Sequence, residues 1–186
     1  MSRPKKIDYL VASLSLGRES YVRELIRNGA MDGEMDGSTY CVSLLYSAIQ
    51  SKSLSFVKYF HRNYERCRGS REAKLIISTA CQCGTLEILQ FLVRKGYDLH
   101  EAEDHALYGT CARGNYDLVK FLIEKGADPN ANGTDSLEEA IRNDCLDIVK
   151  LLMENGADPY NCGSLASAIR WTNVKISNYV RGVLHG

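Results

Sequence analysis

One residue pattern recurs six times along this chain of 186 residues and fills most of it. Its clearest copy is residues 114–126, where the two glycines stand twelve positions apart. The same interval joins Gly17 to Gly29 and Gly84 to Gly96. The copies begin at positions 17, 52, 84, 114, 144 and 172. Self-similarity at a period of about 20 to 50 residues predicts a solenoid, in which each short unit buries its apolar side against its neighbours.

The residues just before each copy predict a first helix with a tightly packed side. An aliphatic residue recurs there, at Leu10, Leu45, Ile77, Leu107, Leu137 and Leu165. A small residue follows three positions later, at Ser13, Ala48, Ala80, Thr110, Ala140 and Ala168. Residues at i and i+3 share one helix face, so the small side chains let the next unit approach closely.

A second helix is predicted inside each copy. Its apolar face has members at Tyr21, Phe56, Ile88, Leu118, Ile148 and Ile176, and again four residues on at Leu25, Phe60, Leu92, Leu122, Leu152 and Val180. Good N-cap residues precede it at Ser53, Thr85, Asn115 and Asn173. Glycines follow it at Gly29, Gly96, Gly126 and Gly156, where a helix commonly ends in the left-handed conformation.

This order of residues resembles the ankyrin repeat, most specifically where the helix is followed by Gly-Ala-Asp, as at 126–128 and 156–158. The resemblance covers about residues 7–184 and implies an all-α solenoid of about six helix-turn-helix units with projecting loops. Because the later repeats are shorter than the usual length of about 33 residues, we expect abbreviated hairpin loops. Such short units also resemble the ankyrin arrays of giant DNA viruses of amoebae. We predict a basic N-terminal tail at 1–6 and one repeat domain over 7–186, with repeats at 7–38, 39–69, 70–101, 102–131, 132–161 and 162–186.

Composition argues against several function classes. Lys plus Arg and Asp plus Glu both number 23, so the net charge is zero, which disfavours bulk electrostatic binding to nucleic acid or to an anionic membrane. No apolar run reaches the roughly 18 residues of a membrane span, and no secretory signal follows the N-terminus. We expect a cytoplasmic monomer, in the host cytoplasm if the source is viral.

Catalytic and metal-binding motifs are absent from the sequence. It contains no dinucleotide or phosphate loop, no His-Glu-x-x-His and no Gly-x-Ser-x-Gly. Cys81 and Cys83 are two residues apart on a predicted helix, which points their sulfurs to opposite faces. We therefore predict no enzyme activity, no metal site and no cofactor.

The resemblance implies a non-enzymatic scaffold that binds an unidentified protein on its concave face. The implied contacts on the helices are Gln82, Cys83, Arg113, Arg142, Asn143, Arg170 and Trp171, and those at the loop tips are Asp98, His100, Glu101, Asp128, Asn130, Asp158 and Tyr160. Arginine and tryptophan are frequent binding hot spots, so we expect a basic inner stripe beside an acidic rim, with Lys120 and Lys150 on the opposite, convex side. Alternatively, Arg170 and Trp171 cover the end of the stack.

Two other functions remain open. The Cys83 thiol could serve a thiol-dependent enzyme, because its position faces the groove. Asn130 could be the substrate of a host asparaginyl hydroxylase, because Leu122 and Asp128 precede it at the spacing found in hydroxylated ankyrin loops.

Overall fold

The computed structural model describes residues 6–30, 38–63, 70–99, 103–131, 135–160 and 174–185. In these ranges the regular structure is helical and contains no β-strand. Residues 1–98 and 99–186 form two compact units.

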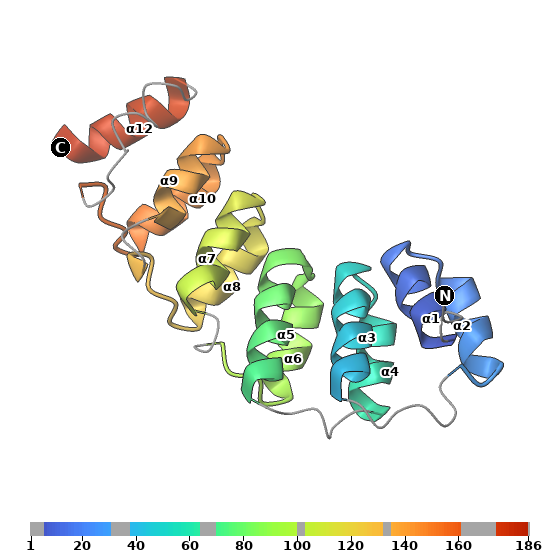
Figure 1. Ribbon diagram of the computed structural model, residues 1–186. Coiled ribbons are helices and arrows are strands. Elements are labelled where there is room, and N and C mark those ends of the chain that lie inside the picture. Colours follow the sequence, from blue (N-terminus) through green and yellow to red (C-terminus); the bar gives the residue numbers. More distant parts are fainter. Residues whose placement is uncertain are drawn as a thin grey trace. The chain divides into compact units, whose positions relative to one another are not determined.

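The first unit contains three helical hairpins (Figure 1). Their helices are α1 (Lys6–Ser15) with α2 (Glu19–Arg27), α3 (Ser38–Gln50) with α4 (Leu54–Asn63), and α5 (Ser70–Cys83) with α6 (Leu86–Arg94). The first helices α1, α3 and α5 pack side by side in this order, and the second helix α4 packs against α6. This stacking of like helices is the arrangement that the repeated sequence predicts.

The second unit repeats the same construction. It contains α7 (Glu103–Ala112) with α8 (Tyr116–Glu124), α9 (Asp135–Arg142) with α10 (Leu146–Glu154), and α12 (Val174–His185). α7 packs against α9, α8 against α10, and α10 against α12. α12 therefore occupies the place of a second helix in the sixth repeat.

The two predicted rows of the first helices belong to the core. Among the described residues, the aliphatic row is at most 5% exposed and the small row at most 6%. Leu165 and Ala168 lie outside the described residues. The close approach of α1, α3 and α5, and of α7 and α9, follows from these small side chains, because they leave room for the neighbouring helix.

The predicted apolar face of the second helices is buried in every repeat except the first. Tyr21 is 42% exposed and Leu25 is half-buried, whereas Phe56, Ile88 and Leu118 are at most 3% exposed. The placement of Tyr21 in the core was therefore wrong. A further buried row went unpredicted, at Val22, Val57, Leu89, Val119 and Val149.

The glycines that follow the second helices adopt the predicted left-handed conformation. Their φ angles are 71° at Gly29, 87° at Gly96, 94° at Gly126 and 91° at Gly156. The next residue then closes the helix end, as where the Ala127 N–H donates to the Leu122 carbonyl at 3.0 Å. The predicted caps are confirmed at Thr85 and Asn115, whose side chains accept hydrogen bonds from the N–H groups of Ile88 and Leu118.

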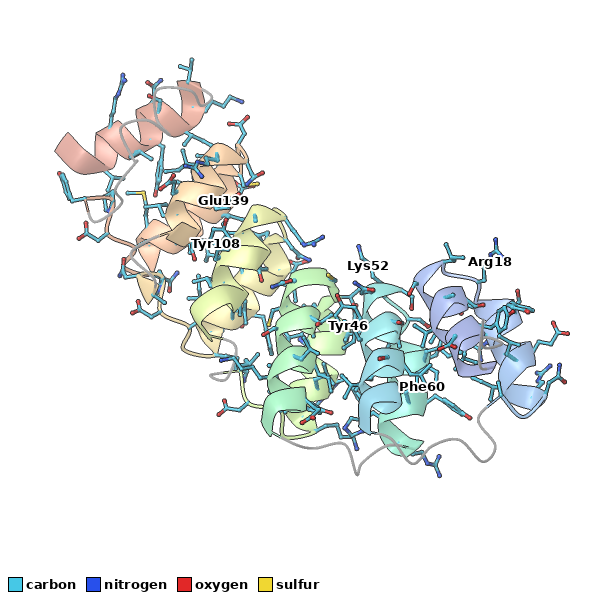
Figure 2. All side chains as sticks on the ribbon, in the orientation of Figure 1. Arg18, Tyr46, Lys52, Phe60, Tyr108 and Glu139 are labelled. Atoms are coloured by element: carbon cyan, nitrogen blue, oxygen red, sulfur yellow. The ribbon has the colours of Figure 1, made fainter. Side chains whose placement is uncertain are left out.

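The turn between the two helices of a repeat uses a left-handed residue even where glycine is replaced. Lys52, labelled in Figure 2, and Asp144 both have a φ of 58°, close to the 66° of Gly114. Gly84 has no positive φ, and its N–H donates to the Ala80 carbonyl at 3.0 Å. A Cβ at this position would lie 2.5 Å from that carbonyl oxygen, so glycine is required at 84 by close approach and not by left-handed geometry.

Candidate protein-interaction surfaces

The ends of two neighbouring first helices bring predicted contact residues together in the second unit. Arg142 is the last residue of α9, Arg113 directly follows α7, and these two helices pack against each other. Arg113, Arg142 and Asn143 are all exposed. Just before them in the chain, Cys111 and Ala140 are 0% exposed. The helix ends therefore present variable polar groups beside an intact core.

Arg142 is neutralised by acids of its own helix. Its guanidinium forms ion pairs with Glu138, one turn earlier, and with Glu139 at 3.9 Å. The Asn143 amide donates to the Glu139 carbonyl at 2.9 Å and to the Glu139 carboxylate at 3.0 Å. The predicted basic stripe is thus an acid–base cluster in the fifth repeat. Arg113, in contrast, forms no ion pair with any described residue.

The first unit places Gln82 and Cys83 at the end of α5, with Gln82 exposed and Cys83 half-buried. Cys81 is 0% exposed, and burial raises the pKa of its thiol to about 12. The two sulfur-bearing residues therefore differ in exposure, as the helical spacing predicts. Among the described residues, no three His, Cys, Asp or Glu side chains gather where they could hold a metal ion.

Four predicted contact residues lie outside the described residues. They are His100, Glu101, Arg170 and Trp171. Their roles stay predictions.

The loop tips of the fourth and fifth repeats are joined through Asn130. Its Nδ2 donates to the Gly156 carbonyl at 2.7 Å, and its Oδ1 accepts from the Asp158 N–H at 2.8 Å. Within each loop, an aspartate accepts from the N–H two residues on, Asp128 from Asn130 and Asp158 from Tyr160, each at 2.8 Å. Both polar atoms of the Asn130 amide thus support the loops. Hydroxylation of Asn130 stays a prediction.

Two other predicted loop-tip side chains are exposed. Tyr160 is 75% exposed, and Asp98 is exposed as well. A tyrosine this exposed offers a large apolar surface with a polar end, which suits it to a binding surface.

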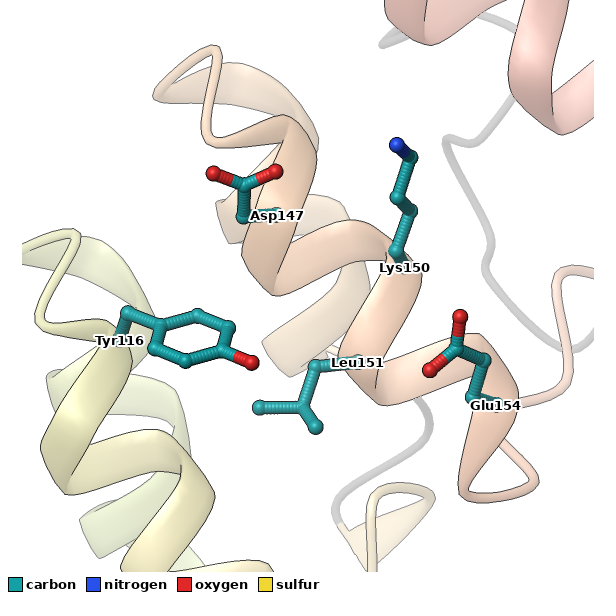
Figure 3. A pocket seen from close by; sticks show the side chains of 5 residues that line it. All are labelled: Tyr116, Asp147, Lys150, Leu151 and Glu154. Atoms are coloured by element: carbon teal, nitrogen blue, oxygen red, sulfur yellow. The ribbon is translucent and has the colours of Figure 1, made fainter.

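Sequence reasoning missed two grooves between neighbouring second helices. The second-unit groove, of about 290 Å³, lies between α8 and α10 and is lined by Tyr116, Asp147, Lys150, Leu151 and Glu154. Figure 3 shows the Tyr116 ring of α8 directed toward Leu151 of α10. The Lys150 ammonium also lies 5.7 Å from the centre of the Tyr179 ring of α12. Lys150 is therefore part of a packed surface and not the free convex charge that the sequence suggested.

The first-unit groove, of about 240 Å³, lies between α2 and α4. It is lined by Arg23, Ile26, Arg27, Ser55, Phe56 and Tyr59. The two grooves differ in which helix supplies the charged residues. Arg23 and Arg27 lie on α2, the earlier helix of its pair, whereas Lys150 and Glu154, at the same two positions of the repeat, lie on α10, the later helix. The signal in the sequence was the pair of positions one turn apart on the second helices, six and ten residues after the start of each copy, where Arg23, Arg27 and Glu154 are exposed and Lys150 is half-buried.

The comparisons agree with the geometry of the repeats. Residues 77–161 match the family model described as ankyrin repeats, in three copies. No relative among curated proteins matches the chain. In the described part of the chain, each helix is too short or too polar to cross a membrane.

Proposed function

Since this chain is an ankyrin-repeat protein, we propose that it is a non-enzymatic adaptor that holds a protein partner on the concave face of its array. Ankyrin repeats are generally protein–protein interaction modules. The proposed contact surface centres on the ends of the first helices in the last three repeats, at Arg113, Arg142, Asn143, Arg170 and Trp171.

The exposure of the helix ends beside a closed core carries the proposal. Arg113 and Asn143 are exposed, while Thr110 and Ala140, which lie one turn earlier, are 0% exposed. Substitutions at these exposed positions therefore remove little packing from the core. Exposed residues that lie in neighbouring repeats can form one continuous contact with a partner.

Arg113 and Trp171 are the strongest candidates for energetic anchors. Arginine and tryptophan are the residue types most enriched among binding hot spots, where truncation weakens binding by about 2 kcal/mol or more. Arg113 forms no ion pair with a described residue, so its guanidinium can pair with a carboxylate of the partner. Arg142 is a weaker anchor, because Glu138 and Glu139 already pair with it.

Affinity capture from lysate of the source cells tests the proposal. We expect the double variant Arg113→Glu, Trp171→Ala to lose the main captured protein, because it reverses one anchor and removes the other. Lys120→Glu is the matched control, since Lys120 is an exposed cation on the second helix α8 of the same unit. Lys150 is unsuitable as a control because it contacts the Tyr179 ring.

Circular dichroism must show that each variant is folded before capture is interpreted. Loss of capture by Lys120→Glu together with retention by the double variant would place the partner on the opposite side and overturn the proposal. If the double variant loses helicity and Trp171→Ala alone causes that loss, the result would instead support the alternative that the Trp171 side chain covers the end of the stack.

A further inference from the structure

The exposed sides of the second helices carry different charges in the two units. In the first unit, the positions six and ten residues after the start of each copy are Arg23, Arg27, Lys58, Arg62, Gln90 and Arg94. We call the five cations of this set the basic outer face, and all five are exposed. The corresponding residues of α8 and α10 are Lys120 with Glu124 and Lys150 with Glu154. A neutral chain thus concentrates positive charge on one surface.

Stability of the helices does not explain this arrangement. A cation in the last turn interacts favourably with the helix dipole, which could account for Arg27, Arg62 and Arg94. However, α8 and α10 have Glu124 and Glu154 in the same place, so the fold does not require a cation there. Like charges one turn apart also destabilise a helix, as do Arg23 and Arg27 on α2. The charge pattern is therefore better explained by the binding of an anionic ligand than by helix stability.

The groove between α2 and α4 gives this basic face a place for an apolar group. Phe56 forms a buried part of the lining at 3% exposure, Ile26 is half-buried, and Tyr59 is 38% exposed. Its volume of about 240 Å³ admits one large side chain. The groove thus offers an apolar seat bordered by two guanidinium groups.

Arg23 is already positioned at the wall of the groove. Its guanidinium carbon lies 5.1 Å from the centre of the Phe56 ring, and its Nη2 donates to the Ser55 hydroxyl at 3.4 Å. Its ion pair with Glu19 is long, at 3.8 Å, and both side chains are half exposed, so it contributes little. Arg27 forms no ion pair with a described residue. Both guanidinium groups therefore have donors available for carboxylates.

We propose that the groove between α2 and α4 is a second docking site, which takes an acidic peptide segment of a partner protein. One aliphatic or aromatic side chain of the segment enters between Ile26, Phe56 and Tyr59. Carboxylates beside this anchor pair with Arg23 and Arg27. This site goes beyond the proposed concave surface and shares no residue with it.

Selection from a phage library of random 12-residue peptides tests the site. The library is selected on the full-length protein and counter-selected on the double variant Arg23→Gln, Arg27→Gln. We expect enriched peptides with one apolar residue flanked by Asp or Glu. Measured by fluorescence polarisation, their affinity should fall about ten-fold or more in the double variant, because two charge-assisted hydrogen-bonding groups are lost. Binding should also weaken with added salt.

Two variants separate the groove from a general effect of charge. Ser55→Phe fills the groove and keeps both arginines, so it should also weaken binding about ten-fold. Arg18→Gln removes an exposed cation just before α2, whose side chain makes no capping hydrogen bond, and should leave affinity within about two-fold. The double variant Arg23→Lys, Arg27→Lys keeps both positive charges and should retain most of the binding. This result would show that the glutamine variant loses binding because it loses charge and not because both positions were changed.

Several results would overturn the site. Enrichment of neutral or basic peptides would remove its charge basis, and normal binding by Ser55→Phe would remove its anchor. Tighter binding of a 20-base single-stranded DNA, abolished by the same glutamine variant, would assign the basic outer face to nucleic acid instead. None of these changes touches Arg113 or Trp171, so the docking site can fail while the concave surface stands.

Discussion

The bridge formed by Asn130 should contribute measurably to the stability of the second unit. Asn130→Ala removes two hydrogen bonds, from Nδ2 to the Gly156 carbonyl at 2.7 Å and from the Asp158 N–H to Oδ1 at 2.8 Å. A typical intramolecular hydrogen bond contributes about 0.5–1.5 kcal/mol, so the two together should contribute about 1–3 kcal/mol. Both lie near the surface, where water can replace them, which favours the lower half of that range.

Two substitutions frame this effect. Asn130→Asp keeps the acceptor for the Asp158 N–H but turns an anionic oxygen toward the Gly156 carbonyl, close to the Asp158 loop, so at pH 7 it should cost at least as much as alanine. Asn155→Ala is the matched control, because its side chain bonds the Leu151 carbonyl one turn earlier at 2.8 Å and joins no second loop. The control loses one hydrogen bond, so we expect its unfolding free energy to fall by about 1.5 kcal/mol at most, the upper end of the range for one bond.

Urea denaturation followed by far-UV circular dichroism measures these differences, and hydrogen exchange of the Asp158 N–H reports on the bridge itself. The N–H should exchange faster in Asn130→Ala and keep its protection in Asn155→Ala. The account of the loops is refuted if Asn130→Ala matches the wild-type unfolding free energy and the Asp158 N–H stays protected.

Three further predictions concern the core, the turns and the buried thiols. Leu122→Ala should lower the unfolding free energy in urea by about 2–5 kcal/mol, since Leu122 is 2% exposed. Leu25 holds the same place in the first repeat but is only half-buried, so Leu25→Ala should cost clearly less. Equal losses would contradict the register. Gly114→Ala should cost about 1–2 kcal/mol for its left-handed backbone, and Gly84→Ala more, because its Cβ would meet the Ala80 backbone. Burial raises the pKa of Cys81 and Cys111 to about 12, so above about pH 9 the unfolded chain releases protons that the folded chain keeps, and stability falls as pH rises. Cys81→Ala should remove up to about 1.4 kcal/mol per pH unit from that slope, and an unchanged slope would show that Cys81 is not buried.

The helical core could be predicted from the sequence because each buried position recurs in every copy. Leu10, Leu45 and Ile77 are one position seen three times, and all are buried. The glycines after the second helices were predictable for the same reason, since their left-handed conformation depends on local geometry. Tyr21 was misplaced because the periodic pattern marks an apolar face but does not show how far that face is covered in each copy.

The surface was harder to predict because its properties depend on neighbours. Arg142 looks like a free cation in the repeat pattern, yet Glu138 and Glu139 pair with it. The bridge from Asn130 joins residues 26 and 28 positions away, which no local pattern reveals. The basic outer face was visible at Arg23, Arg27, Lys58, Arg62 and Arg94, but the neutral total charge concealed it until the helices showed which residues share a side.

Site-specific photo-crosslinking tests most directly the central claim that this ankyrin array holds a partner at the ends of its first helices. A photoreactive phenylalanine analogue placed at position 113 lies on that surface, and the same group at position 120 lies on α8. Both positions are exposed, so both variants should fold. In lysate of the source cells, we predict that position 113 crosslinks to a defined protein and that position 120 does not. Crosslinking from position 120 with none from position 113 would contradict the claim.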